Sequence, residues 1–453
     1  MHSRFAVYGL LTAALVLMLS VFTLGQDLDH VAVSGVVTDP NGLAVVGATV
    51  TIKETTNGKE LTATTNDDGR YQFIALDPGK YKLTATASGF GVMETPELAM
   101  IAGKRVQQDF KLALAGVAVE TTVTADPESV LDVDTSRTGV GSTLTEREIE
   151  ELPNNSRNPL DLVLAVGGTA EEALSTSDLA EDRNSNPRST PLEQGNFTIS
   201  GGASYSNNIT IDGFDNNDDR SARDRFQPSL DAISEVQVIR NQFSAEYGRA
   251  SGGRVNMTTR GGTNRYRGRA YMTFKDARLN ANSWYNNSRG YDRLPFSQYN
   301  PGLTFGGPLS IPKVYNGKNR TFFFVSYEYQ NFQDTTFIDT FLPVIPNPHF
   351  TLPSPTGSGQ YCDTSGSPAP PCPANVGAVQ GFSLLVPTPN LGHIVTARFD
   401  HKLTKDNDLT FGWQFGRKTN RRTSGASTTR LEDSLQAKNI NTDAYNVRDI
   451  HRF

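Results

Sequence analysis

The stretch ISEVQVIRNQFSAEYGRASGGRVNMTTRGGTN, residues 233–264, decides the fold. Residues 233–240 place two valines on one face with a period of two, which predicts a β-strand. Two glycine pairs follow, at 252–253 and 261–262. Glycine allows positive φ and close approach of two backbones, and we expect both features at these pairs. The stretch has neither the G-x-x-x-x-G-K-[ST] nor the G-x-G-x-x-G pattern, so we do not predict a phosphate-binding loop.

Two short helices are predicted upstream of this stretch. Thr145 and Glu148 form a capping box for the first helix, which ends at a Leu-Pro pair after Glu151. Asn158 caps the second helix, which has a proline at its first position and a glycine pair after its end. Residues 169–194 are polar, acidic and aperiodic, so we predict a loop there.

The segment NITIDG, residues 208–213, predicts a strand that runs into a turn. The turn is rich in aspartates, namely Asp212, Asp215, Asp218 and Asp219. Carboxylate oxygens are ligands that Ca²⁺ prefers, but their spacing here does not match an EF-hand loop. We therefore favour a solvated acidic turn and predict no metal site.

The order of these motifs resembles the plug domain of TonB-dependent receptors, and within that family the Oar-like branch. The usual family pattern has Arg-Gly-Pro after the strand and Leu before Tyr-Gly, where this chain has Asn241-Gln242 and Glu246. The resemblance implies that residues 127–265 form an α+β plug inside a barrel, with both glycine pairs where the plug meets the barrel wall. The matching landmark residues are Asp212, Gly213, Arg240, Tyr247, Gly248, Gly252 and Gly253.

The residues before the plug contain a β-branched segment, VAVETTVTA, at Val117–Ala125. An extended segment between domains can add as a strand to the sheet edge of another protein. It resembles a TonB box within the linker 116–126, which implies a TonB-type energy-transducing protein of the periplasm as partner. A plain linker or a last strand of the preceding domain stays open. The box-like residues are Val119, Glu120, Thr121, Thr122, Val123, Thr124 and Ala125.

Residues 30–115 alternate in short runs between turn signals such as Asp77-Pro78-Gly79, which predicts a β-sandwich. This part resembles the carboxypeptidase regulatory-like family, a transthyretin-like and carbohydrate-binding-like fold. No histidine of the chain has a glutamate three residues on, so peptidase chemistry is not implied. The aromatic residues Tyr71, Phe73 and Tyr81 share the core-facing period, so we predict packing and not sugar binding.

Residues 266–453 show segments of about ten residues that are apolar on one face and polar on the other, typical of a transmembrane β-barrel. A soluble antiparallel sheet has the same alternation, and the plug resemblance decides against it. A plugged transporter has about 22 strands, whereas we count about six over this range. We therefore predict an open, partial antiparallel barrel and a chain that is a fragment cut near Phe453.

Two further features of the sequence indicate that the protein is exported. Arg4 and the apolar run Phe5–Leu24 predict a signal peptide over residues 1–25. The two cysteines, Cys362 and Cys372, lie in a Pro/Gly-rich interval at 343–389 that we predict to be an extracellular loop. An oxidising compartment favours a disulfide between them.

The sequence as a whole predicts a mainly β protein of the cell outer membrane with its N-terminal domain in the periplasm. The net charge of −6 argues against a nucleic-acid partner. We expect no enzyme, no catalytic residue and no cofactor. We expect outer-membrane lipid as a partner, and a receptor that takes up an unidentified siderophore, oligosaccharide or peptide by energised plug remodelling. The alternative is a non-transporting surface adhesion or binding protein that uses the sandwich.

Overall fold

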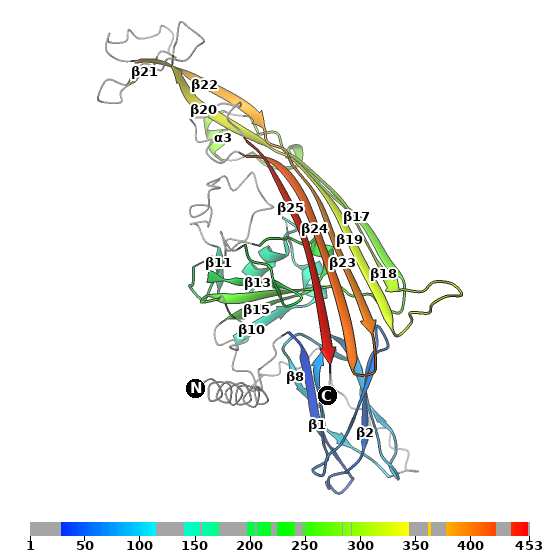
Figure 1. Cartoon of the computed structure of the whole chain (residues 1–453). Helices are drawn as coiled ribbons and strands as arrows, with labels where there is room; N and C mark the ends of the chain where they lie inside the picture. Colours follow the sequence, from blue (N-terminus) through cyan, green and yellow to red (C-terminus); the bar gives the residue numbers. More distant parts are fainter. Residues whose placement is uncertain are drawn as a thin grey trace, which may run out of the picture.

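The computed structural model places three parts side by side (Figure 1). A curved sheet of long strands forms a wall, the plug lies against its concave side, and a small sandwich lies at the ends of the wall strands. The predicted signal peptide and the TonB-box-like segment lie outside the described residues. The structure describes residues 29–114, 140–154, 156–171, 197–203, 206–218, 224–240, 248, 250–282, 284–290, 292–343, 361–363, 377–422 and 436–451.

The first part is a sandwich of two sheets, as predicted. One sheet consists of β4 (Arg70–Leu76), β1 (Val31–Thr38), β8 (Arg105–Gln107) and β9 (Phe110–Lys111). The other consists of β3 (Glu60–Thr64), β2 (Thr49–Glu54), β5 (Gly79–Thr86), β6 (Met93–Glu94) and β7 (Leu98–Met100). Each long strand buries every second residue, because side chains alternate across a strand.

The aromatic residues of the sandwich lie in its core, as the period predicted. Tyr71, Phe73 and Tyr81 are buried. The ring of Tyr71 meets Phe73 edge-on, with the ring centroids 5.9 Å apart. Its hydroxyl donates to the Gln108 carbonyl at 2.6 Å. The hydroxyl of Tyr81 donates to the Asp77 carbonyl at 2.7 Å. These rings therefore stabilise the sandwich and are not presented on its surface.

The second part is an α+β plug with a sheet ordered β10-β15-β16-β13-β14. The strands are β10 (Val140–Leu144), β15 (Ile233–Arg240), β16 (Gly253–Thr259), β13 (Asn208–Ile211) and β14 (Phe214–Asp215). The apolar face of the sheet packs on the helices α2 (Glu146–Glu151) and η2 (Pro159–Ala165), with η5 (Leu230–Ala232) before β15. No helix in the described part of the chain is long and apolar enough to cross a membrane.

The predicted helix caps are confirmed. Thr145 and Glu148 form the reciprocal capping box of α2. Asn158 accepts a hydrogen bond from the amide of Leu160, but η2 is a 3-10 helix. The predicted loop at 169–194 is wrong at its start, because β11 (Thr169–Glu171) pairs with β12 (Phe197–Ile199).

The third part is a six-stranded antiparallel sheet, in agreement with the expected strand number and period. Phe324, Ser326 and Glu328 are buried, whereas Leu303 and Met272 are about half exposed on the other face. The buried face is the one that the plug covers. The strands are β17 (Arg267–Asp276), β18 (Ser297–Pro308), β19 (Thr321–Gln333), β23 (Asn390–Lys402), β24 (Asn407–Arg422) and β25 (Gln436–His451).

The described residues of the interval 343–389, which we predicted to be a loop, include β-strands. The strands β20 (Thr335–Pro343), β22 (Gly377–Pro387) and β21 (Tyr361–Asp363) form a three-stranded sheet that projects beyond the wall strands (Figure 1). The pairing of residues far apart in the sequence satisfies backbone groups that a loop would leave to water. Two short helices, η6 (Ala277–Leu279) and α3 (Trp284–Arg289), lie between β17 and β18.

The glycine pairs do not have the positive φ that we expected. Their close approaches are real, but the first pair meets the plug itself. A Cβ on Gly253 would lie 2.5 Å from the Ile199 side chain. Both glycines of the second pair lie on the barrel wall. A Cβ on Gly262 would lie 2.5 Å from the Phe323 carbonyl oxygen, and a Cβ on Gly261 would lie 3.4 Å from the Asp400 carboxylate. Sterics at a packing contact, and not backbone conformation, therefore explain these glycines.

Candidate functional site

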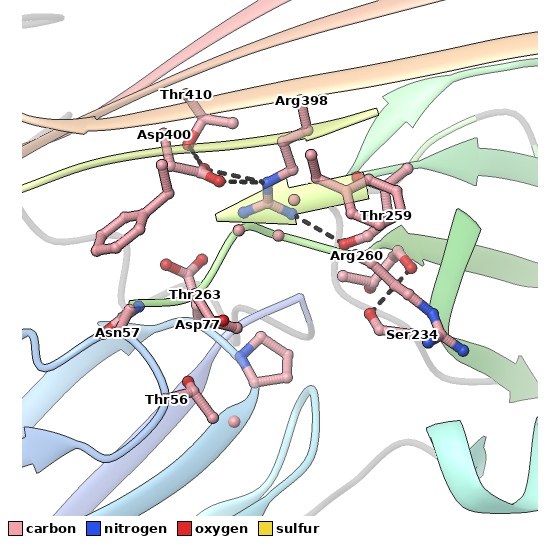
Figure 2. A pocket seen from close by; sticks show the side chains of 18 of the residues that line it. Thr56, Asn57, Asp77, Ser234, Thr259, Arg260, Thr263, Arg398, Asp400 and Thr410 are labelled. Atoms are coloured by element: carbon pink, nitrogen blue, oxygen red, sulfur yellow. Dashed lines mark hydrogen bonds and ion pairs between the residues drawn. The ribbon is translucent and has the colours of Figure 1, made fainter. Parts of the chain in front are cut away.

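The plug meets the barrel wall through a first group of charged side chains at the "IDG" turn. Arg398 on β23 donates through Nε to both carboxylate oxygens of Asp400 at 3.0 Å. Its Nη1 donates to the Thr259 carbonyl at 3.1 Å and lies 3.7 Å from Asp212 of the plug. Figure 2 shows Arg398 between Asp400 and Thr259. The guanidinium therefore ties the last residue of β16 and the turn after β13 to the wall.

The turn itself is built around Asp212, which has a positive φ of 51°. Its carboxylate accepts hydrogen bonds from the Thr259 amide at 2.8 Å and the Thr259 hydroxyl at 2.7 Å. Aspartate tolerates the left-handed region better than most residues, and the following Gly213 also has positive φ. These hydrogen bonds orient the Asp212 carboxylate toward Arg398. The predicted solvated acidic turn is therefore wrong at Asp212, whose side chain is only 10% exposed.

A second charged group joins the plug to the wall. Arg157 pairs with Asp231 of the plug and lies 3.2 Å from Glu328 on β19. Tyr271 on β17 donates to Glu328 at 2.8 Å, and its ring lies 4.7 Å under the Arg157 guanidinium. Arg269 reaches Asp231 at 2.9 Å. Strand alternation brings Tyr271, Arg269 and Glu328 to the inner face together.

The room for this second group comes from a glycine. Gly302 on β18 is paired with Glu328, and a Cβ on Gly302 would lie 2.3 Å from the Tyr271 ring. Beside it, the hydroxyls of Ser229 in the plug and Ser326 in the wall are 2.9 Å apart. The plug–wall seam is therefore polar, with charges matched across it. Buried ion pairs repay their desolvation cost only when both partners are present, so such a seam contributes little net stability while fixing one geometry.

The opposite, polar face of the plug sheet is covered by the sandwich. Glu235 and Gln237 on β15 bond the backbone of Ala102, through its amide at 3.3 Å and its carbonyl at 3.1 Å. Arg254 on β16 donates to both carboxylate oxygens of Asp29 at 2.7 and 3.0 Å. The Arg254 side chain is 1% exposed. Such a bidentate pair is among the stronger protein hydrogen-bonding arrangements.

Burial shifts the protonation of the carboxyl at this contact. Loss of water around Glu235 raises its pKa to about 7, and the amide of Ala102 opposes the shift only in part. Asp29 faces Arg254. No positively charged side chain of the described residues lowers the pKa of Glu235. The charge state of Glu235 therefore changes near neutral pH.

A cavity of about 420 Å³ lies where the three parts meet (Figure 2). Glu54 and Asp77 line it from the sandwich. Burial and the nearby Asp77 raise the pKa of Glu54 to about 7. Burial opposes ionisation of Asp77, but Lys59 and Arg448 hold the pKa of Asp77 below its usual range. Within the described residues, no three His, Cys, Asp or Glu side chains are grouped as metal ligands.

The structure brings together only part of the predicted site. Asp212 lies at the plug–wall seam, Gly213 lies beside Asp29 at the sandwich contact, and Arg240 donates to the Gly167 carbonyl within the plug. Gly248 is exposed, and Gly252 packs on Asn207. Tyr247, Cys372 and the segment Val119–Ala125 lie outside the described residues. Cys362 belongs to β21, and the disulfide stays a prediction.

Sequence reasoning missed most of the charges that join the parts. Glu328 had a signal, because it is the only carboxylate in the otherwise uncharged stretch 321–333. Arg254 and Glu235 gave no signal, since a charged residue on one face of a strand usually faces water. Arg157 lies in a loop between two predicted helices and was not singled out.

Comparison with known families assigns the three parts in the order that the structure shows. The carboxypeptidase regulatory-like domain matches residues 32–113, the TonB-dependent receptor plug domain residues 136–254, and an outer membrane beta barrel domain residues 258–453. The chain belongs to the TonB-dependent receptors. This receptor is therefore a protein of the outer membrane, and the family resemblance of its sequence is confirmed.

Individual relatives match the receptor over part of their length. The TonB-dependent transporter Oar of Myxococcus xanthus is 21% identical over 262 residues, which are 56% of this chain and 23% of Oar. The outer membrane transporter YddB of Escherichia coli is 12% identical with a TM-score of 0.46, over 69% of this chain and 37% of YddB. The ferric enterobactin receptor of Pseudomonas aeruginosa is 15% identical with a TM-score of 0.43, over 70% of this chain and 39% of that receptor.

Proposed function

We propose that the receptor carries out energised uptake across the outer membrane, in which the plug is displaced from the barrel. The plug core supports this proposal. Apart from Ile394 of the wall, its buried apolar members all belong to the plug. Burying one isoleucine is worth about 1.5–3 kcal/mol, so little apolar surface holds the plug to the wall. A plug held mainly by matched charges can leave the wall when water or a ligand replaces its partners.

The partner in this proposal is a TonB-type protein of the periplasm, which binds Val117–Ala125. Members of the family work with TonB and bind ligands such as siderophores. On the plug side, tension on this segment would reach β10 first, since Val140 begins the next described strand. β10 lies at the edge of the plug sheet and pairs with β15 over Val140–Leu144. An edge strand has one neighbour to lose, so remodelling would begin there.

The ligand class stays open between a siderophore, an oligosaccharide and a peptide. In the proposal, the plug loops and the extracellular loops of the barrel bind it. The sandwich stays in the periplasm and takes no part in ligand binding, because its aromatic side chains are packed inside it.

A thiol reporter tests the proposal without the ligand. Ser326 of the wall is 1% exposed beneath the plug, so Ser326→Cys would react with N-ethylmaleimide only when the plug moves. Cells that carry the full-length protein, with Cys362 and Cys372 replaced by serine, would be labelled with and without a proton-motive force. We expect labelling at least tenfold faster in energised cells, and loss of this difference when Glu120–Ala125 is deleted.

A matched control separates the segment from linker length. Deletion of residues 128–133, which lie between the TonB-box-like segment and β10, also removes six residues and should leave energised labelling unchanged. Equal labelling of energised and de-energised cells, or recovery of the intact protein in the soluble periplasmic fraction, would refute transport by plug displacement.

A further inference from the structure

The sandwich contacts the barrel rim as well as the plug. Lys59 lies 2.7 Å from Asp408 at the start of β24, and Asp77 lies 3.1 Å from Arg448 on β25. Further along the rim, Lys402 of β23 donates to the Glu60 carbonyl at 3.2 Å. These contacts come from the sandwich end that faces the wall strands in Figure 1. The sandwich is thus a third body attached to the wall.

The chain between plug and wall is part of the same contact. The amide of Asn264 donates to the Thr56 carbonyl at 3.1 Å, and its side chain bonds both Asn57 and Asn319. Asn319 belongs to the turn between β18 and β19. The sandwich therefore bridges the plug, the plug–wall connection and two rim turns.

Both contact areas are polar, since the apolar core of the sandwich is made of sandwich residues alone. They differ in exposure. On the plug side, the side chains of Arg254 and Asp29 are 1% and 15% exposed. On the rim side, those of Asp77 and Arg448 are 28% and 21% exposed, and those of Lys59 and Asp408 are 12% and 14% exposed. All four are more exposed than Arg254. Water replaces an exposed ion pair at little cost, whereas breaking a buried one leaves an unpaired charge. The rim contacts are therefore the first to give way.

We propose that the sandwich is a clamp between the plug and the periplasmic rim of the barrel, and that it must leave the rim, still attached to the plug, before the plug can be displaced. This inference rests on the proposed uptake function. The physical reason is that the sandwich contacts both the plug and the wall. It therefore opposes their separation until one of the two sets of contacts breaks.

A disulfide across the rim contact tests the clamp. A Cβ on Gly58 of the sandwich would lie 3.1 Å from the Asn319 side-chain carbon, which is within the reach of a disulfide. The double variant Gly58→Cys with Asn319→Cys would be made in the Ser326→Cys reporter, again without Cys362 and Cys372. Labelling of residue 326 would be followed by mass spectrometry in energised cells, oxidised or reduced with dithiothreitol.

We expect the oxidised double variant to be labelled at least tenfold more slowly than the reduced form, which controls for folding. The single variants should show no effect of oxidation, and Gly58→Cys alone controls for the backbone strain at residue 58. An oxidised double variant that is labelled as fast as its reduced form would overturn the clamp while leaving the uptake proposal intact. A reporter without energised labelling even before the disulfide is introduced would overturn both.

Discussion

The contact between sandwich and plug should depend on pH through Glu235, and the change Glu235→Gln should remove that dependence. The carboxyl is 8% exposed on the polar face of β15, where it accepts the Ala102 amide at 3.3 Å. Glutamine has nearly the same shape, and its amide oxygen can accept the same hydrogen bond. The substitution therefore removes the titratable charge and keeps the contact.

The magnitude follows from the two protonation equilibria. Burial raises the pKa of Glu235 from an ordinary value near 4.5 to about 7. Between pH 4.5 and about 7, Glu235 therefore keeps its proton when the sandwich is docked on the plug and loses it when the two are separated. Docking is strongest below pH 4.5, weakens as the pH rises toward 7, and then levels off. A difference of this size corresponds to about 3 kcal/mol, or about a hundredfold in the docking equilibrium.

Hydrogen exchange of the Ala102 amide, in the full-length protein in lipid nanodiscs, measures this equilibrium. After correction for intrinsic exchange rates, protection of the amide in the parent should fall by about a hundredfold between pH 4.5 and pH 8. Glu235→Gln should lack this hundredfold component, so the ratio of protection in the parent to protection in the variant should fall by about a hundredfold over that range. Glu54, whose pKa is also raised to about 7, contributes equally to both proteins and cancels in the comparison.

Parallel pH profiles for the parent and Glu235→Gln would refute the reasoning, because they would show that this carboxyl does not titrate between the docked and separated states. Lower protection in the variant at every pH would show instead that the carboxylate stabilises the contact.

Three further substitutions test the packing of the plug. Gly253→Ala would place a Cβ 2.5 Å from a buried isoleucine, and should lower plug stability by about 1–3 kcal/mol in denaturant melts; Gly248→Ala, with open space around it, is the control. Arg254→Met should cost about 3 kcal/mol by taking the guanidinium away from the Asp29 carboxylate, seen as faster proteolysis of the sandwich, and unchanged proteolysis would contradict it. Asp212→Asn keeps the positive φ but loses the charge that faces Arg398, so basal labelling of the Ser326→Cys reporter should rise; an unchanged rate would contradict this role.

The local elements of this protein could be predicted from the sequence because their causes are local. The strand at Ile233–Arg240 follows from a period of two, and the helix after Thr145 follows from a capping box. Each cause operates within a few residues, so one sequence is sufficient. The inner face of β19 could also be predicted, including Glu328, because alternation assigns every second residue to the same side.

The candidate site could be predicted only in part. Asp212 was found through its motif, but its partner Arg398 lies 186 residues further along the chain. Glu235 on β15 and Arg254 on β16 lie on the polar face of alternating strands, which predicts exposure to water. Their burial depends on Asp29 and Ala102 of another domain, and no local spacing encodes that contact.

The sequence by itself determined the strand periods, the helix caps, the sandwich core and the order of the three domains, since these depend on neighbours along the chain. The tertiary structure alone decided which charges are buried, that the first glycine pair packs within the plug, that Gly377–Pro387 pairs with Thr335–Pro343 in a sheet of its own, and that the sandwich covers the polar face of the plug. The physical reason is desolvation: a side chain loses its water only when a distant part of the chain arrives over it, and that arrival sets its pKa and its pairing.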